Sequence, residues 1–157
     1  MKLKVGDKAP GFELCDQNNK AQKLSHFKGK WVLLYFYPKD DTQVCTIEAQ
    51  MMTVNKKAFA ALNAEILGVS ADTVESHKKF ATKHGTNFPL LADVDKKVIN
   101  AYGVWQQKSM FGNKFMGIKR MSYLIDPKGK IATIYESVQA RKHATQVIKE
   151  LKEKTAA

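Results

Sequence analysis

Residues 31–45 read WVLLYFYPKDDTQVC, and the rest of the chain is organised around them. The first seven of these residues are apolar throughout instead of alternating, which is typical of a central strand covered on both faces. Pro38 ends that strand. From about Thr42 to Ala61 apolar residues recur at helical spacing, with Asp41 or Thr42 placed to cap the helix. Ligands of such sheets bind where the strands end, so we expect a site in the loop between this strand and this helix.

Strand and helix patterns alternate around this segment. This alternation predicts an α/β fold with helices on both faces of a sheet, and a hairpin near the end makes the sheet mixed. Residues 105–117, rich in Gly, Phe and Met, are interpreted as a loop. The other expected elements are strands at 12–15, 21–24, 65–70, 88–91, 120–125 and 130–135, and helices at 73–84, 94–102 and 141–154.

The composition describes one folded, basic domain over residues 1–157, with 44% hydrophobic residues and a formal net charge of +11. It excludes an extended disordered chain. The start, MKLKVGD, has no apolar segment behind its lysines, and the longest apolar run is too short to span a membrane. We therefore expect a cytoplasmic protein with no membrane partner. The charge fits either a nucleic-acid surface or a generally basic protein, and we expect no specific nucleic-acid partner.

The two cysteines, Cys15 and Cys45, form no C-x-x-C motif, and both are expected to be reduced at rest. Cys45 falls in the first turn of the predicted helix, where free N–H groups and the helix dipole favour a thiolate. Thr42 can reach the same turn with its hydroxyl, and Pro38 shields one side from water. The alternative is that Cys45 is a small buried hydrophobe and Thr42 only a cap. Cys15 is expected to pack in its strand.

Other motifs are weak. The four histidines show no metal-ligand spacing, so no metal site is expected, and His77 and His84 are interpreted as solvated helix residues. No nucleotide-binding glycine loop and no nucleophile elbow occur. Residues 108–120 could form a basic aromatic nucleic-acid loop, but we interpret them as a loop that covers apolar surface beside a binding pocket.

The sequence resembles the peroxiredoxins, and specifically the bacterioferritin-comigratory, or peroxiredoxin Q, branch. Pro38, Thr42 and Cys45 match the P-x-x-x-T-x-x-C signature. The similarity covers nearly the whole chain, through the segments GDKAP at 6–10, FYPKD at 36–40, CTIEA at 45–49, YGVW at 102–105, KSMFG at 108–112, MGIKR at 116–120 and LID at 124–126.

The resemblance implies a thioredoxin-like fold and a thiol peroxidase that uses no metal, haem or flavin. Cys45 would attack a hydroperoxide and become a sulfenic acid. Arg120 matches the arginine that holds the thiolate and polarises the peroxide, as a permanently charged guanidinium can. Glu48 matches an acidic residue that orients this arginine, although a solvated helix glutamate is an equal alternative. Hydrogen peroxide and organic hydroperoxides would be the substrates, in antioxidant defence.

The sequence departs from the branch at three positions. Gln43 replaces the usual Pro, Val44 replaces the usual Gly, and Gln50 stands where many relatives carry a resolving cysteine. The helix at 73–84 also lacks a cysteine. The sulfenic acid must then be resolved by Cys15, by a second chain or by an external thiol. We expect an external thiol, meaning thioredoxin, glutaredoxin or a low-molecular-weight thiol. We expect Cys15 not to resolve, because a disulfide needs Cα atoms within about 7 Å and would require a large local rearrangement of the helix start.

Relatives in the branch are commonly monomers, so a monomer is expected, with a weak dimer as the alternative. A second class of function also stays open, namely a thioredoxin-fold binding module with a dormant cysteine, such as a redox-sensitive chaperone or a nucleic-acid binder. The two hypotheses differ in whether Cys45 is a thiolate at neutral pH, because only the peroxidase requires one.

Overall fold

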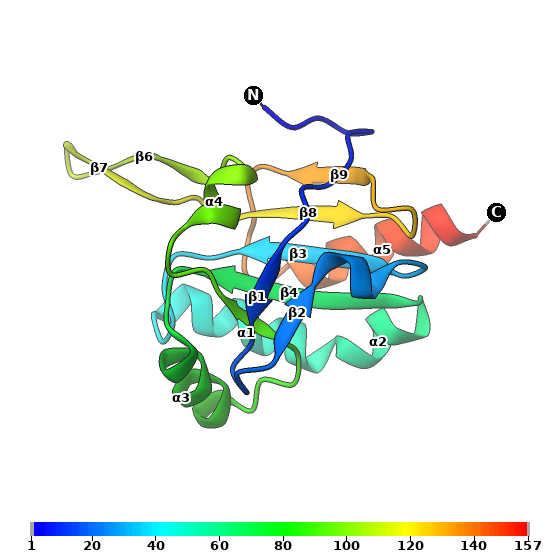
Figure 1. Ribbon diagram of the computed structural model, residues 1–157, viewed down its shortest axis with the longest axis horizontal. Helices are drawn as coiled ribbons and strands as arrows, with labels where there is room; N and C mark the ends of the chain where they lie inside the picture. Colours follow the sequence, from blue (N-terminus) through cyan, green and yellow to red (C-terminus); the bar gives the residue numbers. More distant parts are fainter. Residues whose placement is uncertain (1, 157) are drawn as a thin grey trace.

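A five-stranded mixed sheet forms the centre of the computed structural model, which describes residues 2–156 (Figure 1). The continuous apolar run at 31–36 becomes the middle strand, as predicted, and its side chains alternate between two buried clusters on opposite faces. Its neighbours are parallel on one side and antiparallel on the other. The strand order is β5 (Leu90–Ala92), β4 (Ala64–Ser70), β3 (Trp31–Phe36), β8 (Met121–Ile125) and β9 (Ile131–Tyr135).

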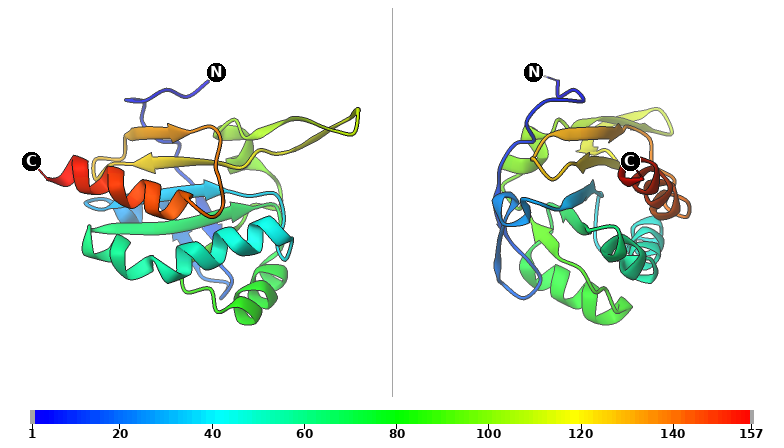
Figure 2. Two further views of the ribbon diagram at one scale, coloured as in Figure 1. Left: turned by 180° about the vertical axis from the view of Figure 1, so that it is seen from behind. Right: turned by 90° about the vertical axis from the view of Figure 1, so that its right-hand side faces the viewer.

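Helices cover both faces of this sheet, as Figure 2 shows. Four of them pack against the face that carries Leu33 and Tyr35, and the smaller elements cover the face that carries Val32 and Phe36. The first group is α1 (Gln43–Val54), α2 (Lys56–Ala61), α3 (Val74–His84) and α5 (His143–Thr155). The second group is α4 (Lys97–Ala101), the short 3-10 helix η1 (Leu24–Phe27) and the hairpin of β1 (Glu13–Cys15) with β2 (Ala21–Lys23).

Three of the expected elements were wrong in part. The helix predicted over 42–61 is divided at Asn55, whose side-chain amide donates to the Met51 carbonyl and competes with the helix backbone. The helix expected at 94–102 is reduced to α4, because Lys96 adopts a left-handed conformation. The loop expected at 105–117 is a β-hairpin, made of β6 (Trp105–Met110) and β7 (Asn113–Ile118).

Gly68 in β4 leaves room for the large side chain of Tyr35 in β3. A Cβ atom at Gly68 would lie 3.0 Å from both the Tyr35 ring and the Leu90 side chain, closer than packed carbon atoms sit. Tyr35 is fully buried, in the same cluster as Cys45 and Ala49 of α1. Close approach rather than backbone conformation therefore favours glycine here, because any Cβ would have to displace the Tyr35 ring or the Leu90 side chain by a few tenths of an ångström.

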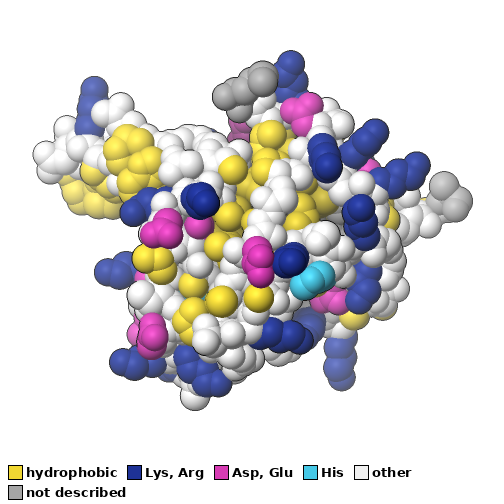
Figure 3. All heavy atoms as spheres, viewed as in Figure 1, with side chains coloured by type: hydrophobic (Ala, Val, Ile, Leu, Met, Phe, Trp, Pro, Cys, Tyr) yellow, Lys and Arg dark blue, Asp and Glu magenta, His cyan; other side chains and the backbone are white. Residues whose placement is uncertain are grey.

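The surface charge is spread out. Figure 3 shows Lys and Arg side chains distributed over the visible face, without one continuous basic patch. No helix among residues 2–156 is long and apolar enough to cross a membrane.

Candidate active site

The junction between β3 and α1 places a cysteine at a helix start. Thr42 is the N-cap of α1 and Asp41 before it has a positive φ of 59°, which turns the chain into the helix. Cys45 lies in the first turn and is 2% exposed. The first helical hydrogen bond runs from Thr46 N–H to the Thr42 carbonyl, at 2.9 Å. The three N–H groups before it are therefore free to favour a negative charge at the sulfur.

The register of β3 with β8 places Arg120 beside this cysteine. Phe36, the last residue of β3, pairs with Met121, the first residue of β8, so Arg120 lies beside the start of the loop. Its Nη2 lies 3.3 Å from Cys45 Sγ and donates to it. Two residues 75 positions apart thus meet because the strands are antiparallel.

Glu48 completes the contact from one helical turn after Cys45. Arg120 Nη1 donates to Glu48 Oε1 at 2.6 Å, and the glutamate side chain is 0% exposed, so its interpretation as a solvated residue was wrong. Burial raises the pKa of Glu48 to about 7, against the opposing effect of Arg120. Its second oxygen, Oε2, has no hydrogen-bond partner among the described residues.

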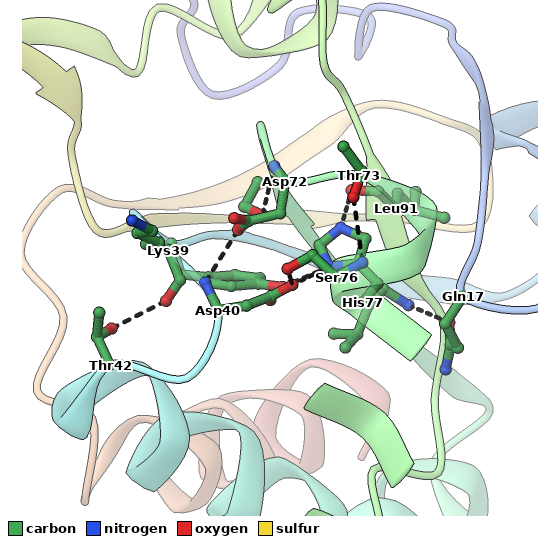
Figure 4. A network of polar contacts seen from close by, with 12 residues as sticks. Gln17, Lys39, Asp40, Thr42, Asp72, Thr73, Ser76, His77 and Leu91 are labelled. Carbon is green, nitrogen blue, oxygen red and sulfur yellow. Dashed lines mark hydrogen bonds and ion pairs between the residues drawn. The ribbon is translucent and has the colours of Figure 1, made fainter. Parts of the chain in front are cut away.

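Arg120 contacts Cys45 directly, whereas the Thr42 hydroxyl bonds within its own loop and Pro38 marks the end of the strand. The Thr42 hydroxyl donates to the Lys39 carbonyl at 2.9 Å, within its own loop, and the expected contact with Cys45 is not formed (Figure 4). Its side chain makes no capping hydrogen bond either. Pro38 is half-buried and follows the last residues of the central strand, so it ends that strand as predicted.

A buried polar network ties the loop to α3 (Figure 4). His77 Nδ1 lies 2.7 Å from Asp40 Oδ2, and its Nε2 lies 3.0 Å from the Leu91 carbonyl, to which it must donate. The Ser76 hydroxyl and the Tyr37 hydroxyl donate to the Asp40 carboxylate, at 2.8 and 2.6 Å. His77 is fully buried, so its interpretation as a solvated helix residue was wrong.

The sequence contained a signal for this burial. His77 lies on one helical stripe with Phe80 and Ala81, both of which are core residues. Its partner Asp40 is 37 positions away, and no local pattern indicates that pairing.

Asp72 joins the same network from the loop before α3. Asp40, Asp72 and His77 hold ligand-type atoms within 4.8 Å of one another. Asp72 Oδ2, however, already accepts from the Asp40 N–H and from the Ser70 hydroxyl. The cluster therefore holds the loop in place through hydrogen bonds.

A second, exposed connection joins the loop to the end of α3. Asp41 pairs with Lys83 and His84, each at 3.0 Å. The hydrogen bond from His84, followed by that from Lys83, lowers the pKa of Asp41. The loop is therefore attached to α3 by one buried and one solvated set of contacts.

Lys108 approaches the site from the β6–β7 hairpin, within the segment expected to flank the pocket, although the sequence assigned this side chain no role of its own. Its Nζ donates to the Ile118 carbonyl at 3.0 Å. Partial burial, and then the positive charge of Arg120, lower the pKa of Lys108, whereas Cys45 acts in the opposite direction. The base of this hairpin therefore adjoins the arginine and the cysteine.

Cys15 lies elsewhere. Its neighbour Leu14 packs in the cluster on one face of the sheet, and Cys45 belongs to the cluster on the other face. The views in Figures 1 and 2 agree that β1 and α1 lie on opposite sides. Both cysteines are free thiols.

Known proteins are similar to this chain in sequence and in architecture. Residues 5–134 match the AhpC/TSA family. The chain is 41% identical to peroxiredoxin Bcp of Bacillus subtilis, over 98% of each chain. Its structure superposes on that of PrxQ from Xylella fastidiosa with a TM-score of 0.92, at 32% identity over 98% of each chain.

A second solved structure bears on activity. It belongs to the bacterioferritin comigratory protein of Xanthomonas campestris, studied for its alkyl peroxide reduction, and it matches with a TM-score of 0.86, at 34% identity over 91% of each chain. These proteins have the thioredoxin-like fold, which confirms the predicted fold class. The chain belongs to the AhpC/TSA family as a peroxiredoxin of the Bcp, or peroxiredoxin Q, branch, and it is a thiol-dependent peroxidase.

Proposed function

We propose that Cys45 is the residue that attacks the hydroperoxide, and that an external thiol regenerates it. The observation that carries this proposal is the 3.3 Å contact between Arg120 Nη2 and Cys45 Sγ at the start of α1. A guanidinium and free helix N–H groups both stabilise a thiolate, and both can stabilise the negative charge that forms on the leaving oxygen.

The reaction is a displacement at oxygen. The Cys45 thiolate attacks the terminal peroxide oxygen, an S–O bond forms as the O–O bond breaks, and the leaving alkoxide or hydroxide takes up a proton. The products are a sulfenic acid and an alcohol or water. A first thiol then displaces water to form a mixed disulfide, and a second thiol releases Cys45 while the two thiols become a disulfide.

Arg120 and Glu48 support this chemistry as a unit. Glu48 holds one arm of the guanidinium at 2.6 Å, which leaves the other arm directed at the sulfur. We assign Arg120 as the group that contacts the reacting atoms and Glu48 as a positioning residue. Pro38 and Thr42 shape the loop, and the Thr42 hydroxyl is within reach of the site only if it leaves the Lys39 carbonyl.

The proposal extends to the setting of the enzyme. Thioredoxin, glutaredoxin or a small thiol supplies the electrons, because the chain holds only two cysteines and the elements that carry them, β1 and α1, lie on opposite sides of the sheet. Two free thiols suit a reducing compartment, so we place the protein in the cytoplasm. The charge of +11 opposes self-association, which favours a monomer over a weak dimer. Residues 1–157 act as one domain.

The test follows oxidation of the reduced protein by one equivalent of hydrogen peroxide. Intrinsic Trp fluorescence gives the rate on millisecond to second times, and intact mass with and without dimedone identifies the product. We expect rapid oxidation and a dimedone adduct in the wild type and in Cys15→Ser, and neither in Cys45→Ser. Oxidation of the wild type no faster than that of a free thiol would refute the role of Cys45.

A further inference from the structure

The β6–β7 hairpin extends from the body of the protein as an arm (Figure 1). Among residues 2–156 its two strands pair only with each other, from Trp105 opposite Ile118 to Met110 opposite Asn113. An isolated two-stranded hairpin is marginally stable in water. The arm is therefore held by its base, and the residues of its outer half are mostly exposed.

The outer half of the arm exposes large apolar side chains. Phe111 at the tip is 97% exposed, and Met110, Phe115 and Met116 are each about half exposed. Figure 3 shows hydrophobic side chains gathered on this projection. Phe and Met are enriched at protein interfaces, and Met adapts to partners of different shape.

The turn at the tip is built from an unfavourable residue. Phe111 and Gly112 form the two-residue loop, and both have positive φ, 52° and 81°, as a type I′ turn requires. Asn-Gly is the preferred pair there, and an aromatic side chain at positive φ is strained. The phenyl group thus neither packs against the chain nor stabilises the turn, which indicates a role outside the folded monomer.

The charged residues of the arm are all basic. The hairpin contains Lys108 near its base and the exposed Lys114 on its outer half, Lys119 and Arg120 follow it, and residues 105–120 include no acidic residue. A surface of this kind is complementary to one with acidic groups around an apolar centre.

The base of the arm reaches the candidate active site. Arg120 follows β7 by two residues and contacts Cys45, and Lys108 lies beside it. Six residues of strand span about 20 Å, so the tip and the sulfur are about that far apart. A small thiol cannot touch both, and a flat membrane that held the tip would leave Cys45 at a distance. A folded protein of ordinary domain size can touch both.

We propose that the β6–β7 arm is the docking surface for a small acidic dithiol protein that reduces Cys45, a proposal that rests on the assigned role of that cysteine. One thiolate of the partner attacks the sulfenic sulfur, an S–S bond forms, and the hydroxyl leaves as water with one proton. The partner's second thiol then attacks the partner's bonded sulfur and releases Cys45 as a thiolate. The partner leaves oxidised, as a disulfide.

The test separates the two halves of the catalytic cycle. Wild-type protein, Phe111→Asn and the control Val54→Ser, which removes another exposed apolar side chain at the far end of α1, are each oxidised with one equivalent of hydrogen peroxide. Reduction is then measured with a thioredoxin of net negative charge and, separately, with dithiothreitol. Phe111→Asn suits the turn, so the hairpin keeps its shape while the aromatic ring is lost.

We expect Phe111→Asn to slow reduction by thioredoxin on the order of tenfold, as loss of an aromatic interface residue does. Reduction by dithiothreitol should stay at the wild-type rate, and Val54→Ser should match the wild type with both reductants. Equal rates of the wild type and Phe111→Asn with thioredoxin, or equal losses with both reductants, would overturn the proposal. Oxidation of Cys45→Ser at the wild-type rate would instead refute the role of Cys45.

Discussion

A single guanidinium bridges two side chains that are negatively charged when ionised. Arg120 places one nitrogen on Cys45 and another on Glu48, and its planar fork fixes the angle between these two contacts. Burial of both partners keeps water from competing for the same donors. The site therefore depends on the shape of the cation as well as on its charge.

Arg120→Lys tests that dependence, because lysine keeps the charge and loses the fork. We expect the rate constant for oxidation by hydrogen peroxide to fall about a hundredfold or more, as on removal of an oriented donor. Stopped-flow Trp fluorescence measures it. The matched control is Arg141→Lys, at the chain's other, exposed arginine, and a comparable loss in both variants would contradict the prediction.

Glu48 gives stability a pH dependence of predictable sign. Its pKa is raised to about 7 in the folded protein, against a usual value of 4.5, so the folded state binds more protons between these limits. The free energy of unfolding therefore falls as pH rises from 4.5 to 7, by roughly 3 kcal/mol, and levels off above.

Urea unfolding across this pH range checks that slope. In Glu48→Gln the contribution is absent, so the stability of the wild type relative to the variant should decline with rising pH. Glu153→Gln, at an exposed position on α5, should retain the wild-type slope. Parallel curves for the wild type and Glu48→Gln would show that the glutamate titrates normally.

At the scale of elements, the loop before α1 is held in place by α3. Its buried connection is the Asp40–His77 pair with Ser76 and Tyr37, and its solvated connection is Asp41 with Lys83 and His84. Buried pairs cost far more to break than exposed ones, since the remaining partner is left without water. The two connections therefore differ in importance although they join the same elements.

Asp40→Asn and Asp41→Asn compare the two connections directly. We expect Asp40→Asn to lower the free energy of unfolding by about 3–5 kcal/mol and to slow oxidation of Cys45, because the loop loses its buried anchor. Asp41→Asn tolerates the same left-handed backbone and should remain close to the wild type in both measurements. If Asp40→Asn and Asp41→Asn had equal effects on urea unfolding and on the rate of oxidation measured by stopped flow, the buried connection would be no more important than the exposed one.

The sequence predicted those elements whose pattern is local. The run at 31–36, the helix at 73–84 with Gly85 at its end, and Cys45 in a first turn all follow from periodicity and capping. The resemblance added Arg120, which composition alone would assign to surface charge. The burial of His77 was missed because it depends on a residue that only the fold brings near.

The hairpin at 105–118 was missed for a different reason. Its tip is Phe-Gly rather than Asn-Gly, so the usual turn signal is absent, and the strands lack a buried face that would give them alternating polarity. Because Phe111 occupies the position that Asn usually takes in such a turn, sequence patterns do not identify the β6–β7 hairpin.

At the scale of the whole molecule, the central sheet separates the two thiols. Packed layers lie about 10 Å apart, so elements on opposite faces of a sheet are about 20 Å apart, whereas a disulfide needs Cα atoms within about 7 Å. The strand β1, which carries Cys15, and the helix α1, which carries Cys45, lie on such opposite sides of the central sheet (Figures 1 and 2). Direct pairing would require the sheet layers to separate.

Cys15→Ser is accordingly expected to keep the full peroxidase turnover of the wild type with a given thiol reductant. After one equivalent of hydrogen peroxide and no reductant, the intact mass of the wild type should show an added oxygen rather than loss of two hydrogens. Detection of an intramolecular disulfide, or loss of turnover in Cys15→Ser, would contradict this expectation.

The absence of a side chain at Gly68 has a consequence for the evolution of the sequence. The Tyr35 ring fills the space that a Cβ at 68 would need, and it belongs to the same buried cluster as Cys45. A Cβ at 68 would press on the Tyr35 ring and the Leu90 side chain, whereas a smaller residue at 35 alone would leave a cavity. A descendant that gains a side chain at 68 is therefore expected to carry smaller side chains at 35 or 90 as well, so these positions should vary together.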